Sequence, residues 1–215
     1  MIKLEKTEVV GWESAIRGMR NPMNSWGKSD SFWNDIGCGI PYYEIRKNDI
    51  ELMRKLAKNG SVHAKYRRMI AVYADIIAPL YWWKEFDTYK VGTVANSCST
   101  MHKIHEKEFT LDDFSHEHLE TVTSSMDFLT SLEMLVDDLN TARNWYIKTK
   151  DQRFWWQMIQ LLPSSYNQKR TVMLNYEVLA NIYHNRKDHK LDEWREFCRW
   201  IEDLPLSEII TLEEK

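Results

Sequence analysis

The chain has 215 residues, of which 43% are apolar and 28% are charged, and its formal net charge is -3. This balance is typical of a folded globular protein and excludes an intrinsically disordered chain. The weakly acidic charge gives no support to bulk electrostatic binding of nucleic acid, so we expect no nucleic-acid partner. The length suits one domain, and we expect a single domain over residues 1–215.

Cysteine usage and the N-terminal residues indicate the compartment. Cys38, Cys98 and Cys198 are far apart and show neither a disulfide pattern nor a metal-binding spacing. The first residues lack the apolar region of a signal peptide, and no apolar run is long enough to span a membrane. We therefore expect a cytoplasmic protein in a reducing environment, without a membrane partner.

The N-terminal part, residues 11–47, is expected to be a helix and a long loop after an edge strand over residues 2–10. Residues 12–19 predict the helix, and the Gly-, Pro-, Asn- and Ser-rich segment 17–31 predicts the loop. This loop carries several donors suited to phosphate, although composition favours a solvated connection: Arg17, Arg20, Asn24, Ser25 and Lys28.

The core is expected between about residues 50 and 203. A helix over Asn48–Asn59 is predicted, with Asn48 and Glu51 as a capping box. A strand follows from Tyr66 to Ile77, and Pro79 ends it before an aromatic helical turn. The buried face of this strand is predicted from apolar residues at a period of two: Ile70, Val72, Ala74 and Ile76.

The second half is predicted to be mainly helical. The longest helical pattern runs from Asp112 to about Lys148, and its apolar stripe favours a core or oligomer contact. Further segments are a helix over 152–162, a polar turn over 164–170, helices over 171–185 and 188–203, and a peripheral acidic tail over 204–215. The fold class is therefore α+β, a single helix-rich domain with a small antiparallel sheet.

Three groups of residues are candidate sites of chemistry. The pairs His102/His105 and His116/His118 lack a third ligand, so we expect no metal site. The segment 97–99 lacks a nucleophile elbow, and hydrogen bonding to a phosphate is the better interpretation of its hydroxyls.

The third group lies on one predicted helix face, where Asn175 and Arg186 flank an apolar patch. Arginine is suited to a carboxylate, a phosphate or a uracil edge. An arginine that meets the helix C-terminal dipole explains the pattern equally well.

These residues resemble the flavin-dependent thymidylate synthases, also called thymidylate synthase complementing proteins. That family has an early histidine, an X-Pro, an aromatic helical turn and an Arg-His-Arg signature followed by a serine. A second motif has an asparagine and an arginine eleven residues later. The matching positions here are His63, Ala78-Pro79, Glu85 in place of glutamine, Thr88-Tyr89-Lys90 on Arg-His-Arg, Asn96, Ser99, Leu162-Pro163, Asn175 and Arg186.

The resemblance covers roughly residues 50–203 and indicates a divergent member with a degenerate Arg-His-Arg motif, in which Lys90 is the cation that remains. It implies a homotetramer that methylates deoxyuridylate (dUMP), with reduced FAD as hydride carrier, NADPH as reductant and methylene tetrahydrofolate as carbon donor. Arg186 would be catalytic by polarising the pyrimidine. The resemblance assigns cofactor binding to His63, Lys90, Asn96 and Asn175, and substrate binding to Glu85, Ser99 and Arg186.

Two classes of function stay open at this point. One is a divergent thymidylate synthase-like enzyme that binds a pyrimidine deoxynucleotide and methylates it. The other is a non-catalytic protein that binds or sequesters a nucleotide on the same scaffold.

Overall fold

The computed structural model describes residues 2–35, 37, 39–123 and 126–213, so Cys38 lies outside the described residues. The chain divides into two compact units. Unit 1 consists of residues 1–3, 75–88 and 96–171, and unit 2 of residues 4–74, 89–95 and 172–215. A four-stranded sheet has the order β1 (Lys3–Val10), β4 (Ala71–Pro79), β8 (Asn167–Asn175) and β5 (Val94–Ser97).

The N-terminal elements of unit 2 confirm the predicted strand and helix as β1 and α1 (Trp12–Arg20). The expected loop contains two short 3-10 turns, η1 (Asn21–Met23) and η2 (Trp26–Lys28). An antiparallel hairpin of β2 (Phe32–Asn34) and β3 (Tyr42–Glu44) follows.

Helix α2 (Lys47–Lys58) confirms the next predicted helix, but the predicted capping box is wrong. The side-chain oxygens of Asp30 instead accept hydrogen bonds from the backbone nitrogens of Asn48 at 3.0 Å and Asp49 at 3.3 Å. A carboxylate from the preceding loop thus satisfies the free N–H groups of the first helical turn.

The buried strand begins later than predicted. Residues 65–69 form the 3-10 segment η3 (Lys65–Met69), and β4 begins at Ala71. The predicted apolar face is confirmed, since none of its four residues is more than 1% exposed: Ile70, Val72, Ala74 and Ile76. The aromatic turn is α3 (Leu80–Phe86), which buries two indole rings in unit 1 and is followed by η4 (Asp87–Tyr89).

The long helix expected from Asp112 is wrong in its first part. The segment contains the 3-10 turn η5 (Leu111–Asp113) and two short strands, β6 (Thr121–Thr123) and β7 (Met126–Asp127). The two strands pair antiparallel. Residues 124 and 125 lie outside the described residues. The helix α4 (Phe128–Thr149) starts where the Asp127 carboxylate accepts a hydrogen bond from Thr130 N at 3.1 Å.

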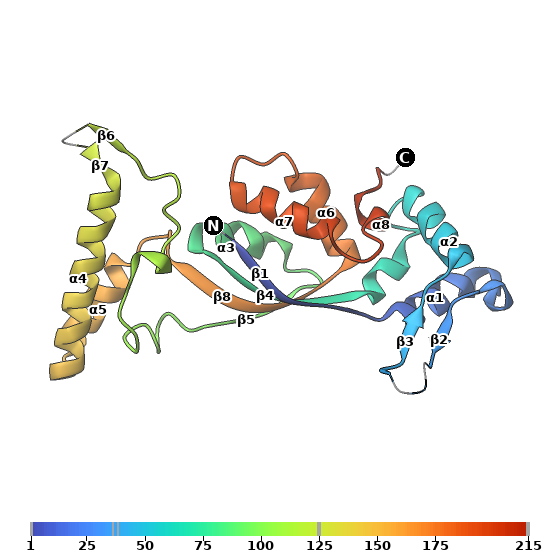
Figure 1. Cartoon of the computed structure of the whole chain (residues 1–215), viewed down its shortest axis with the longest axis horizontal. Helices are drawn as coiled ribbons and strands as arrows, with labels where there is room; N and C mark the ends of the chain where they lie inside the picture. The colour runs from blue at the N-terminus through green and yellow to red at the C-terminus, as the bar shows by residue number, and fades with distance from the viewer. Residues whose placement is uncertain (1, 36, 38, 124–125, 214–215) are drawn as a thin grey trace. The chain divides into compact units, whose positions relative to one another are not determined.

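Helix α5 (Gln152–Leu161) confirms the next prediction, and Figure 1 shows α4 and α5 side by side within unit 1. Their shared apolar core contains the fully buried Leu139 and Met158. The predicted turn over 164–170 is confirmed at residues 164–165 and is wrong from residue 167 onward, because β8 occupies residues 167–175. The predicted helix start at Thr171 is wrong for the same reason.

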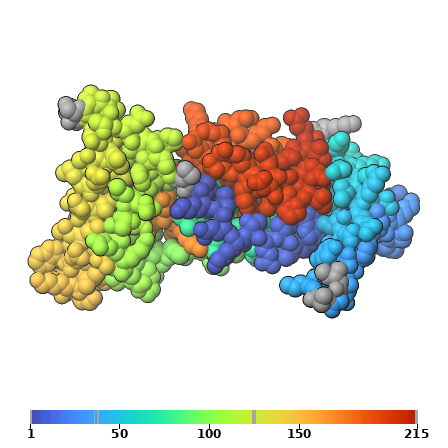
Figure 2. Space-filling model, in the orientation of Figure 1, coloured from blue at the N-terminus to red at the C-terminus, as the bar shows by residue number. Residues whose placement is uncertain are grey.

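The C-terminal elements of unit 2 are α6 (Tyr176–Arg186), α7 (Asp192–Glu202) and α8 (Glu208–Thr211). Figure 2 shows this red segment beside the dark blue N-terminal strand, and Trp200 Nε1 donates to Thr7 Oγ1 at 2.9 Å. The observed elements confirm the fold class, a helix-rich α+β chain with small antiparallel sheets. None of the described helices is long and apolar enough to cross a membrane.

Candidate functional site

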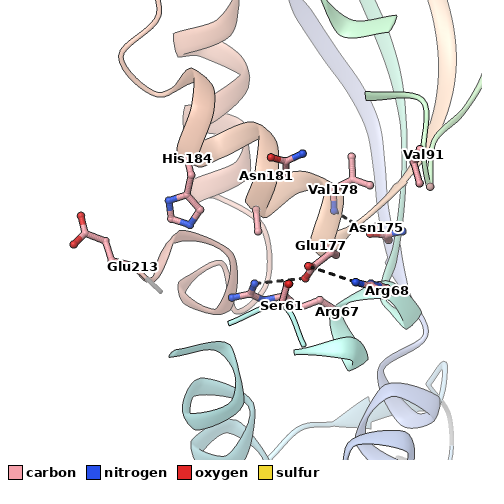
Figure 3. A pocket seen from close by; sticks show the side chains of 12 residues that line it. Ser61, Arg67, Arg68, Val91, Asn175, Glu177, Val178, Asn181, His184 and Glu213 are labelled. Carbon is pink, nitrogen blue, oxygen red and sulfur yellow. Dashed lines mark hydrogen bonds and ion pairs between the residues drawn. The ribbon is translucent and has the colours of Figure 1, made fainter. Parts of the chain in front are cut away.

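Unit 2 contains a cavity of about 900 Å³ beside α6 (Figure 3). Helix α6 supplies one wall, and the turn at Ser61 with the 3-10 segment η3 supplies another. Residues 91–92 and Glu213 complete the lining. All of these segments belong to unit 2.

The first turn of α6 is organised by Asn175. Its side-chain oxygen accepts a hydrogen bond from Val178 N at 3.0 Å and so caps the helix. This cap places Val178, Asn181 and His184 along the cavity wall. The Nε2 atom of His184 is buried and has no hydrogen-bond partner among the described residues. An imidazole in this position is available to a ligand as donor or acceptor.

Two arginines face the same carboxylate across the cavity. Arg67 is fully buried at 0% exposure, whereas Arg68 is 58% exposed. Arg67 Nη1 lies 3.5 Å from Glu177 Oε2, and Arg68 Nη2 lies 4.0 Å from Glu177 Oε1. In Figure 3 the carboxylate lies between the two guanidinium groups. Both distances exceed those of a strong charge-assisted hydrogen bond.

The loop at Gly92 forms the other rim. Gly92 has a φ of +81°, and a Cβ added there would lie 3.0 Å from Asn175 Nδ2 and 3.1 Å from Val178 Cγ2. A glycine is therefore needed both for the backbone conformation and for the close approach to α6. The loop carries Val91, which is 92% exposed, and thus places an apolar side chain at the rim.

Arg186 lies at the last residue of α6 and outside the cavity wall. Its Nε donates a hydrogen bond to the hydroxyl of Tyr89 at 2.9 Å. Its guanidinium carbon lies 4.8 Å from the ring centre of Trp194 and 5.7 Å from that of Tyr89. The arginine is thus held by two aromatic rings and by one hydroxyl, all in unit 2.

The other predicted site residues of unit 2, His63 and Lys90, do not line the cavity. His63 is exposed in the turn after α2, two residues from the wall residue Ser61. Lys90 is exposed beside the rim residue Val91. Of the predicted residues, Asn175 is the one that the described cavity wall contains.

The remaining predicted residues belong to unit 1. Glu85 is half-buried on α3, and its backbone oxygen accepts a hydrogen bond from Thr88 Oγ1 at 2.7 Å. Asn96 is exposed on β5. Ser99 is half-buried, and its hydroxyl oxygen accepts from His102 N at 3.0 Å.

Sequence reasoning missed Arg67, Glu177 and His184. A signal for them was present, because Glu177, Asn181 and His184 follow one another at i, i+4 and i+7 and so share a helix face. The arginine doublet at 67–68 directly precedes the buried face of β4, where a charge needs a partner. Among the described residues, no group of three His, Cys, Asp or Glu side chains is placed to hold a metal ion.

Comparison with known proteins bears on the fold. No protein-family model matches the sequence, and no curated protein matches it. The structure is similar to flavin-dependent thymidylate synthase ThyX from Helicobacter pylori in complex with FAD and dUMP, at 16% sequence identity and a TM-score of 0.68. A second structure of that enzyme with FAD and dUMP has 14% identity and a TM-score of 0.67. Each comparison covers 99% of this chain and 100% of the other. The chain therefore has the fold of the flavin-dependent thymidylate synthases.

Proposed function

We propose that this protein binds a pyrimidine deoxynucleotide in unit 2, on a flavin-dependent thymidylate synthase-like scaffold. The observation that carries the proposal is the cavity beside α6, where guanidinium, amide and imidazole groups line one space. Two structures with the same fold were solved with dUMP. Their likeness supports the fold, and the chemistry of the cavity supports the ligand class.

The cavity has the size and the mixed lining of a small-molecule site. Its volume of about 900 Å³ falls in the usual range for such sites, roughly 300–1,000 Å³. Val91, Val178 and Ala180 offer apolar surface to a planar ring. The Asn181 amide both donates and accepts, which suits the alternating donor and acceptor edge of a pyrimidine.

Arg186 and Asn175 keep their expected roles within this proposal, and Lys90 stays a proposed contact to a phosphate of the ligand. Arg186 lies outside the cavity wall, so the nucleotide would have to extend from the cavity toward the end of α6 to reach it. There Arg186 would bind the nucleotide and stabilise charge that develops on the pyrimidine, since its guanidinium is fixed by Tyr89 and Trp194. His63 likewise stays a proposed ligand contact, and the roles expected for Glu85, Asn96 and Ser99 stay proposals for unit 1 that this cavity does not include. We also retain a homotetramer and a cytoplasmic location as proposals.

The segment 88–90 does not fit the diphosphate of FAD in the way that the resemblance implies. Thr88 uses its hydroxyl on the backbone of α3, and the hydroxyl of Tyr89 accepts the bond from Arg186. Lys90 is the one cation of the segment, and it is a point charge rather than a bidentate fork. FAD, NADPH and methylene tetrahydrofolate therefore enter as ligands to be tested.

The second candidate is a nucleotide-binding protein without catalysis. The specific observation in its favour is the hydrogen bond from Arg186 to Tyr89, because a neutral phenol stands where the resemblance has the histidine of Arg-His-Arg. Purified protein with flavin absorption in its visible spectrum would favour the enzyme. A colourless protein that binds dUMP but no added flavin would favour the second candidate.

Isothermal titration of dUMP tests the binding proposal directly. We expect Asn181→Ala and Arg186→Ala each to weaken binding at least tenfold, and Arg199→Ala on the exposed face of α7 to leave it unchanged. Arg199 is a matched control because it is 64% exposed and paired with Glu196. Absence of dUMP binding to the unmodified protein, or unchanged binding in both test variants, would contradict the proposal.

A further inference from the structure

We propose that Arg67 and Arg68 form an anion subsite in the cavity of unit 2, and that Glu177 holds this subsite closed as a built-in competitor. The ligand class is a phosphate or pyrophosphate group. This inference rests on the proposed function only where it takes the rest of the ligand to be a nucleoside. The anion subsite itself follows from the charges and distances of the cavity wall.

Glu177 is a loosely held counter-ion. Its distances to the two guanidinium groups, 3.5 Å and 4.0 Å, contrast with the pair of Arg20 and Asp49 in the same unit. There the guanidinium reaches one carboxylate oxygen with two nitrogens, at 2.6 Å and 2.7 Å. The Oε2 atom of Glu177 is buried and has no hydrogen-bond partner among the described residues. A buried carboxylate oxygen in this state costs free energy and is readily replaced.

A phosphate satisfies this position better than the carboxylate does. It carries a larger charge and three acceptor oxygens, so both guanidinium groups can bind it at once. The position also lies at the first turn of α6, where the helix dipole favours an anion. Further donors lie on the same cavity wall, namely the Ser61 hydroxyl and the Asn181 amide.

The internal carboxylate has a clear role when no ligand is bound. Arg67 is fully buried, and a buried guanidinium with no nearby anion would destabilise the fold. Glu177 supplies that anion and stays 20% exposed, so it can turn toward solvent when a phosphate arrives. Ligand entry would then exchange one counter-ion for another and leave no unpaired buried charge.

Titration with inorganic pyrophosphate at fixed ionic strength tests the inference on the full chain. We expect Glu177→Gln to bind pyrophosphate at least fivefold more tightly than the unmodified protein, because the competing charge is gone. Glu177→Asp keeps the charge and should bind as the unmodified protein does. Glu213→Gln makes the same change of charge elsewhere on the cavity lining and should alter the affinity less than twofold.

Equal gains in Glu177→Gln and Glu213→Gln would overturn the inference, since the effect would then be general electrostatics. If neither the unmodified protein nor Glu177→Gln binds pyrophosphate at millimolar concentration, the inference is overturned as well. If Glu177→Gln does not fold by circular dichroism, Arg68→Ala replaces it, and an unchanged affinity would overturn the inference. Pyrophosphate binding without dUMP binding would uphold the subsite and contradict the proposed function, so the two failures are distinguishable.

Discussion

The hydroxyl of Tyr89 accepts a hydrogen bond from Nε of Arg186 at 2.9 Å, although the two residues are 97 positions apart in the chain. The ring of Trp194 lies 4.8 Å from the same guanidinium and restrains it from a second side. Tyr89 stands where the resemblance has a histidine, so a neutral phenol sets the orientation of the arginine. A guanidinium fixed in this way loses less rotamer entropy when it binds a ligand.

The first prediction concerns this orientation. Tyr89→Phe keeps the ring and removes the acceptor, so we expect dUMP binding to weaken about five- to tenfold, the equivalent of about 1 kcal/mol for one lost hydrogen bond. Titration calorimetry measures it. Tyr183→Phe is the matched control, because Tyr183 lies on α6 like Arg186 while its hydroxyl donates to Glu202 of α7 at 2.7 Å. Equal losses in both variants would show that orientation by Tyr89 is unimportant.

The second prediction concerns the rim of the cavity. Gly92→Ala introduces a Cβ at a φ of +81°, 3.0 Å from Asn175 Nδ2, so we expect the free energy of unfolding to fall by about 1–2 kcal/mol. Urea denaturation followed by tryptophan fluorescence measures it. Gly27→Ala should change the stability by less than about 0.5 kcal/mol, because nothing lies within 4 Å of its added Cβ. A loss as large in Gly27→Ala would contradict this explanation.

Much of the fold was predictable where one local signal dominates. The buried face of β4 was predicted from apolar residues at a period of two. The aromatic turn α3 was predicted from Pro79 and the aromatic residues that follow it. Helix α5 was predicted as a short helix that Pro163 ends, and the structure ends it at Leu161. These elements were predictable because a short stretch of sequence contains the whole signal for each of them.

The polar strand β8 could not be predicted from its own sequence. Its Lys169 pairs with Asp75 at 2.9 Å, and its Arg170 pairs with Asp87 at 2.9 Å, both within unit 1. Each carboxylate is more than 80 positions away in the chain, so the local sequence of residues 167–170 predicts a solvated turn. Tertiary pairing overrode the local preference.

The candidate site was predicted in part. Asn175 was recognised from its spacing to Arg186, and it does cap α6. The adjacent face with Glu177 and His184 was missed, because charged and polar residues near the two ends of a helix usually face solvent. The role of Glu177 depends on Arg67, which lies 3.5 Å from it and belongs to a segment about 110 positions earlier.

The third prediction uses the cysteines that the structure describes. Burial raises the pKa of the Cys198 thiol to about 12, and the side chain is 3% exposed. Cys98 is exposed. We expect an alkylating reagent at pH 8 to modify Cys98 in the native protein and Cys198 only after denaturation, since the thiolate is the reactive form. Peptide mass spectrometry measures both, and rapid native labelling of Cys198 would contradict its burial.

The fourth prediction concerns the buried pair of Arg20 and Asp49, which anchors the loop of residues 21–31. Asp49 also accepts hydrogen bonds from Ser29 Oγ and Ser31 Oγ, both at 2.7 Å. Asp49→Asn leaves a buried guanidinium without its anion, so we expect a loss of about 3–5 kcal/mol in the free energy of unfolding. Glu51→Gln on the same helix is the control, because that carboxylate is 60% exposed.

The same carboxyl sets a pH dependence. Burial alone would raise the pKa of Asp49, but the hydrogen bonds from Ser29, Ser31 and Arg20 outweigh it and hold the pKa below its ordinary value of 3.8. The unfolded chain therefore binds a proton at a higher pH than the folded chain does. The stabilisation from Asp49 is fully present above pH 3.8 and is lost as the pH falls through the lower folded pKa. The urea concentration at the unfolding midpoint should decrease as the pH is lowered from 5 to 2.5, and it should decrease less steeply in Asp49→Asn. Parallel profiles for the two proteins would show that this carboxyl does not control acid stability.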